Sequence, residues 1–256
     1  MAEFDRSRAY GLRAGSRTDT FAYDEGLRAY MVRVYNYMGI GLVVTGVVAY
    51  TFYSMAVVTN DSGAIVALTP LGQSIYGSWL RYVIAFAPLA VLIMFASRMN
   101  QMSSATAQAV FWGFSALMGL SLSSIFLRYT GSSISHIFFV TAATFGTVSL
   151  WGYTTKRDLT QVGSFLIMGL IGIFFASLVN VFLHSTQMQF VISVLAVVIF
   201  TGLTAYDTQT LKDNYSVEAR GGEEALGRSA VAGALNLYLD FINIFIALLQ
   251  LFGDRR

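Results

Sequence analysis

The chain has 256 residues, of which 55% are hydrophobic and only 12% are charged. A soluble protein carries about 25% charged residues, so 16 Lys and Arg plus 14 Asp and Glu are too few to cover a water-exposed surface. The net charge of +2 excludes the dense basic face that nucleic acid requires, and the absence of cysteine excludes disulfides and thiolate metal sites.

The N-terminal segment, residues 1–34, is polar and rich in arginine, and it shows no cleavable secretory signal. We expect it to be cytoplasmic, and either partly disordered or helical at the membrane interface. Four of its apolar residues have the spacing of one helix face: Leu27, Tyr30, Met31 and Val34. This pattern predicts an interfacial helix or, alternatively, an extension of the first membrane span.

Seven apolar runs follow within one predicted transmembrane domain, residues 35–256. Each is long enough, as a helix, to cross a hydrocarbon core roughly 30 Å thick. The runs are 37–58, 80–96, 105–127, 133–151, 164–183, 189–211 and 229–252. Because backbone amides in lipid must be hydrogen-bonded within their own segment, the prediction is an all-α polytopic membrane protein with seven transmembrane helices.

The basic residues predict the orientation. The N-terminal segment and alternate loops carry 12 Lys or Arg, whereas the other side carries four. The positive-inside rule therefore places the N-terminus in the cytoplasm and, after seven spans, the C-terminus outside. Arg255 and Arg256 oppose the last step, which leaves a re-entrant final segment as the alternative. The compact loops and absent cysteine favour the cytoplasmic (inner) membrane of a bacterium.

Two acidic residues, Asp207 and Asp240, lie inside apolar runs, and the other 12 lie in termini or loops. A charge at mid-helix costs about 2.5–3.5 kcal/mol on insertion scales, so such residues generally face a bundle interior or water and mark a functional path. If the two carboxyls meet, they cannot both stay ionised and titrate as one unit. We predict a proton sensor in an ion pathway. The alternative is a protonated clamp between helices.

A polar stripe on the last run supports this interpretation. Asn236, Asp240 and Asn243 recur at helical spacing, which predicts the wall of a hydrated pathway and a central position for the last helix. Asn236, Asn243 and Tyr206 are therefore predicted to line or support the pathway, although ordinary interhelical hydrogen bonding would also explain the asparagines. Arg98 is a candidate latch for Asp207, or else a cytoplasmic anchor.

Several activities have no support in the sequence. Lys156 and Lys212 both lie in loops, so no retinal Schiff base is available in a span. Phosphate-binding glycine loops and paired-histidine metalloprotease motifs are absent. Asp240 follows Leu-Tyr-Leu and lacks the glycine-containing sequence of intramembrane aspartyl proteases. We expect no enzymatic activity and no cofactor.

Two segments carry a family resemblance. AYDTQ at 205–209 and LNLYLDFINIFIALLQLFG at 235–253 resemble the transmembrane Bax inhibitor motif family, also called the Bax inhibitor-1 family. The seven apolar runs, the GLSLSS sequence of the third run and the short Lys-Arg loop before the fifth also fit. The resemblance covers residue 35 to the end and points to a bacterial member.

The resemblance implies a seven-helix fold with the final helix at its core and a pH-dependent calcium leak. Asp207 and Asp240 would be the family's di-aspartyl pH sensor, and Arg98 would match a basic latch. The second span lacks the acidic residue of some relatives. Ca²⁺ prefers 6–8 oxygen ligands, so two carboxylates would bind it only transiently, as a permeant ion.

The leading hypothesis is thus a calcium leak channel gated by protonation of Asp207 and Asp240. A proton-coupled transporter is the first alternative. A non-conducting regulator that binds other membrane proteins is the second. The expected partners are the lipid bilayer, Ca²⁺ and protons.

Overall fold

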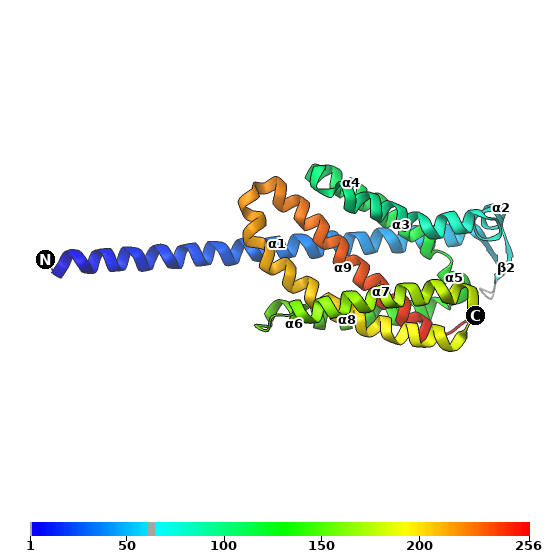
Figure 1. The fold of residues 1–256 in the computed structure, drawn as a ribbon. Coiled ribbons are helices and arrows are strands. Elements are labelled where there is room, and N and C mark those ends of the chain that lie inside the picture. The colour runs from blue at the N-terminus through cyan, green and yellow to red at the C-terminus, as the bar shows by residue number, and fades with distance from the viewer. Residues whose placement is uncertain (1, 61–64) are drawn as a thin grey trace.

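The computed structural model is a bundle of long helices with one short β-hairpin (Figure 1). It describes the backbone of residues 2–60 and 65–256, and side chains from residue 23 onward except at 61–64 and 100. The long helices are α1 (Ala2–Ala56), α3 (Leu80–Arg98), α4 (Ser104–Leu122), α6 (Gly131–Thr154), α7 (Thr160–Leu183), α8 (Thr186–Glu218) and α9 (Gly222–Phe252). The helical membrane architecture predicted from the apolar runs is confirmed.

Shorter elements join the long helices. They are β1 (Val57–Thr59), β2 (Ile65–Leu68), α2 (Pro70–Gly72), the π-helix η1 (Gln73–Gly77), the 3-10 helix η2 (Met99–Gln101), α5 (Ile125–Arg128) and the 3-10 helix η3 (Ala219–Gly221). The strands pair antiparallel, with Val57 opposite Leu68. The sequence prediction continued the first helix to residue 58. The β-branched run from Val57 to Thr59 instead adopts the extended conformation that such side chains favour.

Six segments of the described chain are long and apolar enough to cross a membrane. Five are Tyr23–Ala56, Leu80–Arg98, Ser104–Arg128, Gly131–Thr154 and Thr160–Leu183, and the sixth is Thr186–Phe252. This count differs from the seven predicted runs because the sixth segment, of 67 residues, contains both α8 and α9. The chain reverses between them through η3 and Gly222, whose positive φ of 79° suits glycine.

Side-chain caps fix where several helices begin. α4, α6 and α8 follow Ser103, Thr130 and Ser185, whose hydroxyl oxygens accept a hydrogen bond from a backbone amide of the first turn. α7 ends at Leu183 and is capped by His184, which has a left-handed backbone conformation with φ of 50°. These local signals explain why three connections fall in the short loops expected from hydropathy.

Residues 27–34 of α1 pack within the bundle. Their predicted apolar face is buried against protein, with exposed fractions of 6% for Leu27, 4% for Tyr30 and Met31, and 0% for Val34. Tyr30 also lies 2.9 Å, oxygen to oxygen, from Ser229 of α9. Of the two expected arrangements, the structure has the extension of the first span. Residues 1–22 lie outside the part whose side chains are described.

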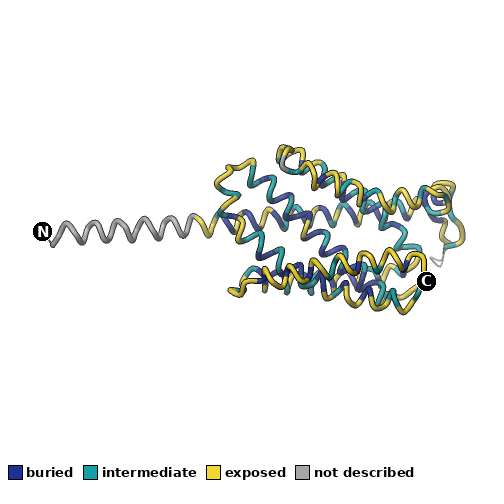
Figure 2. Tube along the Cα trace, viewed as in Figure 1, coloured by how far each residue is buried: buried dark blue, intermediate teal, exposed yellow. Residues whose placement is uncertain are grey.

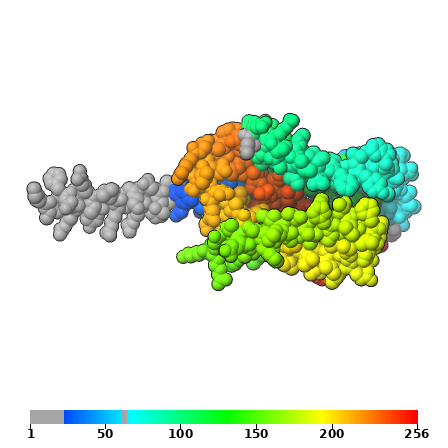
Figure 3. Space-filling view, viewed as in Figure 1, coloured from blue at the N-terminus to red at the C-terminus, as the bar shows by residue number. Residues whose placement is uncertain are grey.

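Helix α9 contributes much of the core. Sixteen of its residues are buried, and it packs against α8, α1, α6 and α4. In the space-filling view the red part of α9 shows only between other helices, whereas its orange start lies at the surface (Figure 3). Outward faces carry large apolar side chains instead, such as Phe165 and Phe182 of α7 at 69% and 78% exposure, and Figure 2 shows this division between buried and exposed faces. Such an apolar exterior suits contact with lipid.

The end of α9 is anchored far from its start. Arg255 forms a β-bridge with Tyr129, and the amide of Arg256 donates to the carbonyl of Arg128 at 2.9 Å. The α9 C-terminus therefore meets the connection between α5 and α6, whereas its start lies beside Tyr30 of α1 (Figure 1). In this structure α9 runs the length of the bundle and does not turn back.

Candidate functional site

The two aspartates predicted to form a pair lie on adjacent helices, α8 and α9. Asp240 is buried, with 4% of its surface exposed, and Asp207 is partly buried. Asp207 and Thr204 of α8 are neighbours of Asp240 across the contact between the two helices. Because α8 and α9 form the most extensive helix pair of the bundle, this packing brings together two acids that are 33 positions apart in the sequence.

The surroundings of Asp240 contain hydroxyl groups and no basic partner among the described side chains. Its Oδ2 atom is buried without a hydrogen bond. The Thr204 hydroxyl lies beside the carboxyl group, but its proton goes to the Phe200 carbonyl at 2.8 Å. A hydroxyl group has one proton to donate, so Thr204 offers Asp240 mainly an acceptor. A carboxyl group in this position is short of donors that would stabilise a negative charge.

The three residues of the polar stripe on α9 differ in how far they are buried. Asn236 is exposed, Asp240 is buried, and Asn243 is partly buried and donates to the Leu239 carbonyl of its own helix at 2.8 Å. Helical spacing placed these residues on one side, but the neighbouring helices bury only Asp240 fully. The predicted continuous inner wall from Asn236 to Asn243 is therefore not seen in this conformation.

Tyr206 lies on α8 like Asp207, but its side chain packs against α7. Its ring packs on Gly163 in the first turn of α7, where any added Cβ would collide with the ring. Three residues later, Gln209 accepts from the Leu159 amide and donates to the Arg157 carbonyl, both at 2.8 Å. Together they attach the connection between α6 and α7 to α8, which supports the position of Asp207 from outside.

Arg98 lies exposed at the end of α3 and forms no ion pair with Asp207. Within the described residues one salt bridge occurs, between Arg33 of α1 and Glu223 at the start of α9, at 3.3 Å. The latch assigned to Arg98 stays a prediction, and it requires a rearrangement of α3 relative to α8.

Sequence reasoning missed a buried hydroxyl cluster beside the acids. Ser149 of α6 lies between Tyr35 of α1 and Thr208 of α8, with oxygen distances of 2.5 Å and 3.0 Å. Ser149 and Thr208 are 2% and 0% exposed. The four-residue spacing of Thr204 and Thr208 inside an apolar run was a signal, but three helices had to be placed before the cluster could be recognised.

A second polar cluster holds the opposite end of α9. Gln250 accepts hydrogen bonds at 2.7 Å from both Gln189 and Ser193 of α8. Asn180 of α7 donates to Gln189 at 3.1 Å and accepts from the Ser185 amide at 3.0 Å. These side chains satisfy one another in the apolar interior, so the cluster works as an interhelical clamp.

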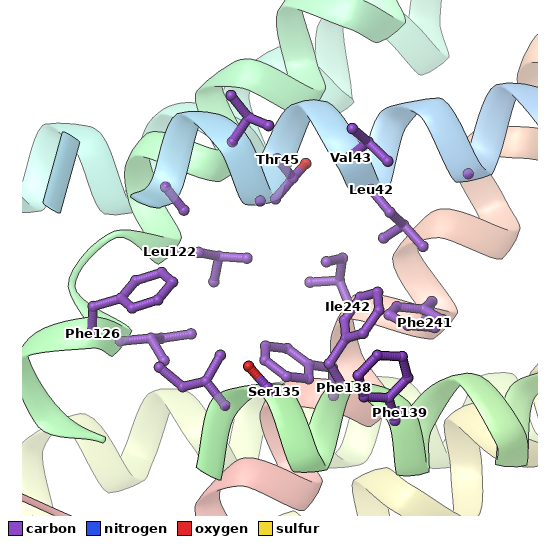
Figure 4. A pocket seen from close by; sticks show the side chains of 17 residues that line it. Leu42, Val43, Thr45, Leu122, Phe126, Ser135, Phe138, Phe139, Phe241 and Ile242 are labelled. Atoms are coloured by element: carbon purple, nitrogen blue, oxygen red, sulfur yellow. The ribbon is translucent and has the colours of Figure 1, made fainter. Parts of the chain in front are cut away.

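An apolar cavity of about 570 Å³ opens between α1, α6 and α9 (Figure 4). Phe138 and Phe139 face Leu42 across it, and Thr45 and Ser135 are its polar residues. A cavity with so few polar groups does not attract ordered water. It is therefore a poor cation path and separate from the acid pair.

The described part of the chain contains no group of three or more His, Asp or Glu residues that could hold a metal ion. Two carboxyl groups alone supply fewer oxygens than the 6–8 that Ca²⁺ prefers. The site is thus unsuited to storing calcium. What the geometry does provide is a pair of acids inside an apolar bundle, next to a chain of hydroxyl groups.

Fold and site together define a polytopic α-helical membrane protein with a buried aspartate, Asp240, that has Asp207 of the adjacent helix as a neighbour. The family described as "Inhibitor of apoptosis-promoting Bax1" matches residues 27–256. The chain belongs to this family, the Bax inhibitor-1 family, and the resemblance found at its last two apolar runs is confirmed.

Relatives from distant bacteria align over nearly their full lengths. An uncharacterized protein of Rickettsia prowazekii is 42% identical over 241 residues, covering 94% of this chain and 95% of the relative. Inner membrane protein YbhL of Escherichia coli is 42% identical over 232 residues, covering 90% and 94%. An uncharacterized membrane protein of Streptococcus pyogenes is 36% identical over 230 residues, again covering 90% and 94%.

Proposed function

We propose that the protein is a pH-sensitive calcium leak channel, in which Asp207 and Asp240 share a proton and form the gate. The observation that carries the proposal is the burial of Asp240, which has an unpartnered Oδ2 atom and Asp207 as its charged neighbour. Two negative charges side by side in an apolar interior are costly, so the pair holds one proton more readily than none.

Proton loss provides the switch in this proposal. Removing the shared proton leaves two charges that repel each other across the contact between α8 and α9, and this repulsion shifts the packing of the two helices. The structure, with Asp240 4% exposed, then corresponds to a closed arrangement. Arg98 would pair with Asp207 only after α3 and α8 have moved.

The proposal includes a topology. We place α1, α3, α4 with α5, α6, α7, α8 and α9 as seven spans in a bacterial cytoplasmic membrane, with α9 central. The N-terminus is cytoplasmic, and the connection between α5 and α6 lies outside with the end of α9. The distribution of basic residues supports this orientation, as does the anchoring of Arg255 and Arg256 to residues 128–129.

Two other functions are the alternatives to a calcium channel. A proton-coupled transporter would use the acids as a relay, and a regulator that binds other membrane proteins would pass no ions. Purified protein in liposomes loaded with a calcium indicator separates the three, with external pH varied and a second solute either absent or supplied. The channel passes Ca²⁺ without a second solute and in a pH-dependent way. Flux that requires a second solute, or no flux at any pH, contradicts the proposal.

A further inference from the structure

A chain of hydrogen-bonded hydroxyl groups leads from one end of the bundle toward the acid pair. It begins at Tyr35 of α1, continues at 2.5 Å to Ser149 of α6, and reaches Thr208 of α8 at 3.0 Å. Thr208 is the residue after Asp207, and Thr204, which lies beside Asp240, is one helical turn before it. The chain therefore spans three helices, and its last hydroxyl belongs to the residue that follows Asp207 on α8.

The hydrogen bonds of this chain all point the same way. The Thr208 hydroxyl donates to the Thr204 carbonyl at 2.7 Å. Because a hydroxyl has one proton, Thr208 must accept from Ser149, and Ser149 in turn must accept from Tyr35. The donors thus run from Tyr35 inward. A proton arriving at the Tyr35 oxygen can be passed on by successive transfers along existing hydrogen bonds.

The outer end of the chain opens into a cavity. Tyr35 and Ser149 both line a space of about 620 Å³ between α1 and α6, together with Arg28, Gly146 and Tyr153. Arg28 is exposed and lies seven residues before Tyr35 on α1, so the cavity reaches the charged end of the bundle. Tyr35 and Ser149 are the two lining residues through which the hydroxyl chain meets this cavity.

We propose that Tyr35, Ser149 and Thr208 form a proton relay that connects the cytoplasmic end of the bundle with the Asp207 and Asp240 pair. This inference deepens the proposed function by naming the side from which protons reach the sensor. One proton enters at the Tyr35 oxygen, each hydroxyl hands its own proton to the next, and Thr208 turns its O–H from the Thr204 carbonyl to a carboxylate oxygen. Net transfer is one proton, with no change of redox state.

Other charged groups around Asp240 do not offer a competing route. α4 carries no charged residue, and α6 carries only His136, near its far end. Arg33 of α1 is paired with Glu223. Lys212 of α8 points to the Tyr153 carbonyl, at 2.9 Å. Among the described residues, Asp207 is thus the ionisable neighbour of Asp240.

The test uses the full chain in lipid vesicles and follows the infrared carboxyl band that appears after a rapid drop in pH. The part of this band that disappears in Asp240→Asn reports protonation of the pair, independently of calcium flux. We expect Ser149→Ala and Tyr35→Phe to slow its rise by at least about tenfold, since positioned proton carriers contribute on the order of 10²-fold or more. The final amplitude should match the unsubstituted protein, because the acids themselves are retained.

Two matched pairs of variants separate the relay from general effects on packing. Thr208→Val interrupts the chain, whereas Thr141→Val removes an equally buried α6 hydroxyl that bonds only the Ile137 carbonyl. Gly146→Leu places a side chain in the cavity, at a position where an added Cβ has no atom within 4 Å. Gly113→Leu is its control, because an added Cβ there is equally free of contacts but Gly113 does not line the cavity. The first member of each pair should be slow and the second normal.

The outcomes distinguish the relay from the channel. Normal kinetics in both Ser149→Ala and Tyr35→Phe overturn the relay, even when calcium flux is pH-dependent. A slowed carboxyl band with no calcium flux supports the relay and removes the channel. Equal slowing in Thr141→Val and Thr208→Val also overturns the relay, because it would reflect a general loss of packing.

Discussion

The phenol oxygen of Tyr238 on α9 lies 2.7 Å from the hydroxyl oxygen of Thr45 on α1, and both side chains are buried. Thr45 also bonds the carbonyls of Gly41 and Ser115, each at 2.9 Å, so Tyr238 is the donor in this pair. The contact fixes α9 against α1 and α4 two residues before Asp240. It sets the position of the acid without involving its charge.

Removing the Tyr238 hydroxyl group should lower the free energy of unfolding less than removing the Thr45 hydroxyl group. Tyr238→Phe deletes the donor while Thr45 keeps its carbonyl acceptors, so we expect a loss of roughly 0.6 kcal/mol of unfolding free energy. Thr45→Val leaves the Tyr238 hydroxyl buried and unpaired, which costs about 1–3 kcal/mol. Reversible unfolding in detergent micelles measures both. A larger loss for Tyr238→Phe would show that the donor assignment is wrong.

Two glycines of α6 should respond in opposite ways to alanine. A Cβ on Gly152 would collide with the Ala205 backbone, including its Cα at 2.9 Å, whereas a Cβ on Gly146 meets nothing within 4 Å. Gly152→Ala therefore forces α6 from α8 and should cost about 1–3 kcal/mol. Gly146→Ala should be neutral or stabilising by up to about 1 kcal/mol. Thermal unfolding of the two variants checks this, and equal stability would contradict the close approach.

The proposed topology can be tested by labelling, because the chain has no cysteine. Single cysteines at Lys156 and Arg220 should be protected from an impermeant thiol reagent added to intact cells. Cysteines at Thr186 and Arg255 should react. All four positions are exposed in the structure, so protection reports the side of the membrane. Labelling of Lys156→Cys in intact cells would show that the orientation is the opposite of the proposed one.

Arg98 offers a prediction about the rearranged state. It is exposed and unpaired with Asp207 in this structure, so Arg98→Gln should leave the stability of this conformation within about 0.5 kcal/mol. If Arg98 latches Asp207 after the helices move, the variant should alter calcium flux at high pH, where Asp207 is ionised. Calcium flux is measured over a pH series for the unsubstituted protein, Arg98→Gln and a control, Arg128→Gln, at the other end of the bundle. Identical profiles rule out the latch.

Much of the fold follows from the sequence because lipid imposes simple rules on it. Each long helix overlaps one apolar run, since only an internally hydrogen-bonded helix is stable there. The hairpin at 57–68 was missed because its strands are too short to show a period. The burial of Leu27 and Val34 was ambiguous, because an apolar helix face can meet either protein or the membrane interface.

The site was only partly predictable. Asp207 and Asp240 stood out because a charge is expensive in an apolar run, and their interaction depends on how α8 folds back on α9. Asn236 and Asp240 share a helix face in sequence but differ in exposure, which is decided by neighbouring helices. The cluster of Tyr35, Ser149 and Thr208 needs the relative heights of three helices, which no local pattern contains.

Calcium flux through liposomes as a function of pH, compared between the unsubstituted protein, Asp207→Asn and Asp240→Asn, tests the central claim most directly. Each asparagine keeps the shape of the side chain but removes the carboxyl proton, so each variant alone should abolish the pH-dependent component. The double variant should add nothing further, because the two acids act as one unit. An unchanged pH profile in either single variant would contradict a gate built on a shared proton.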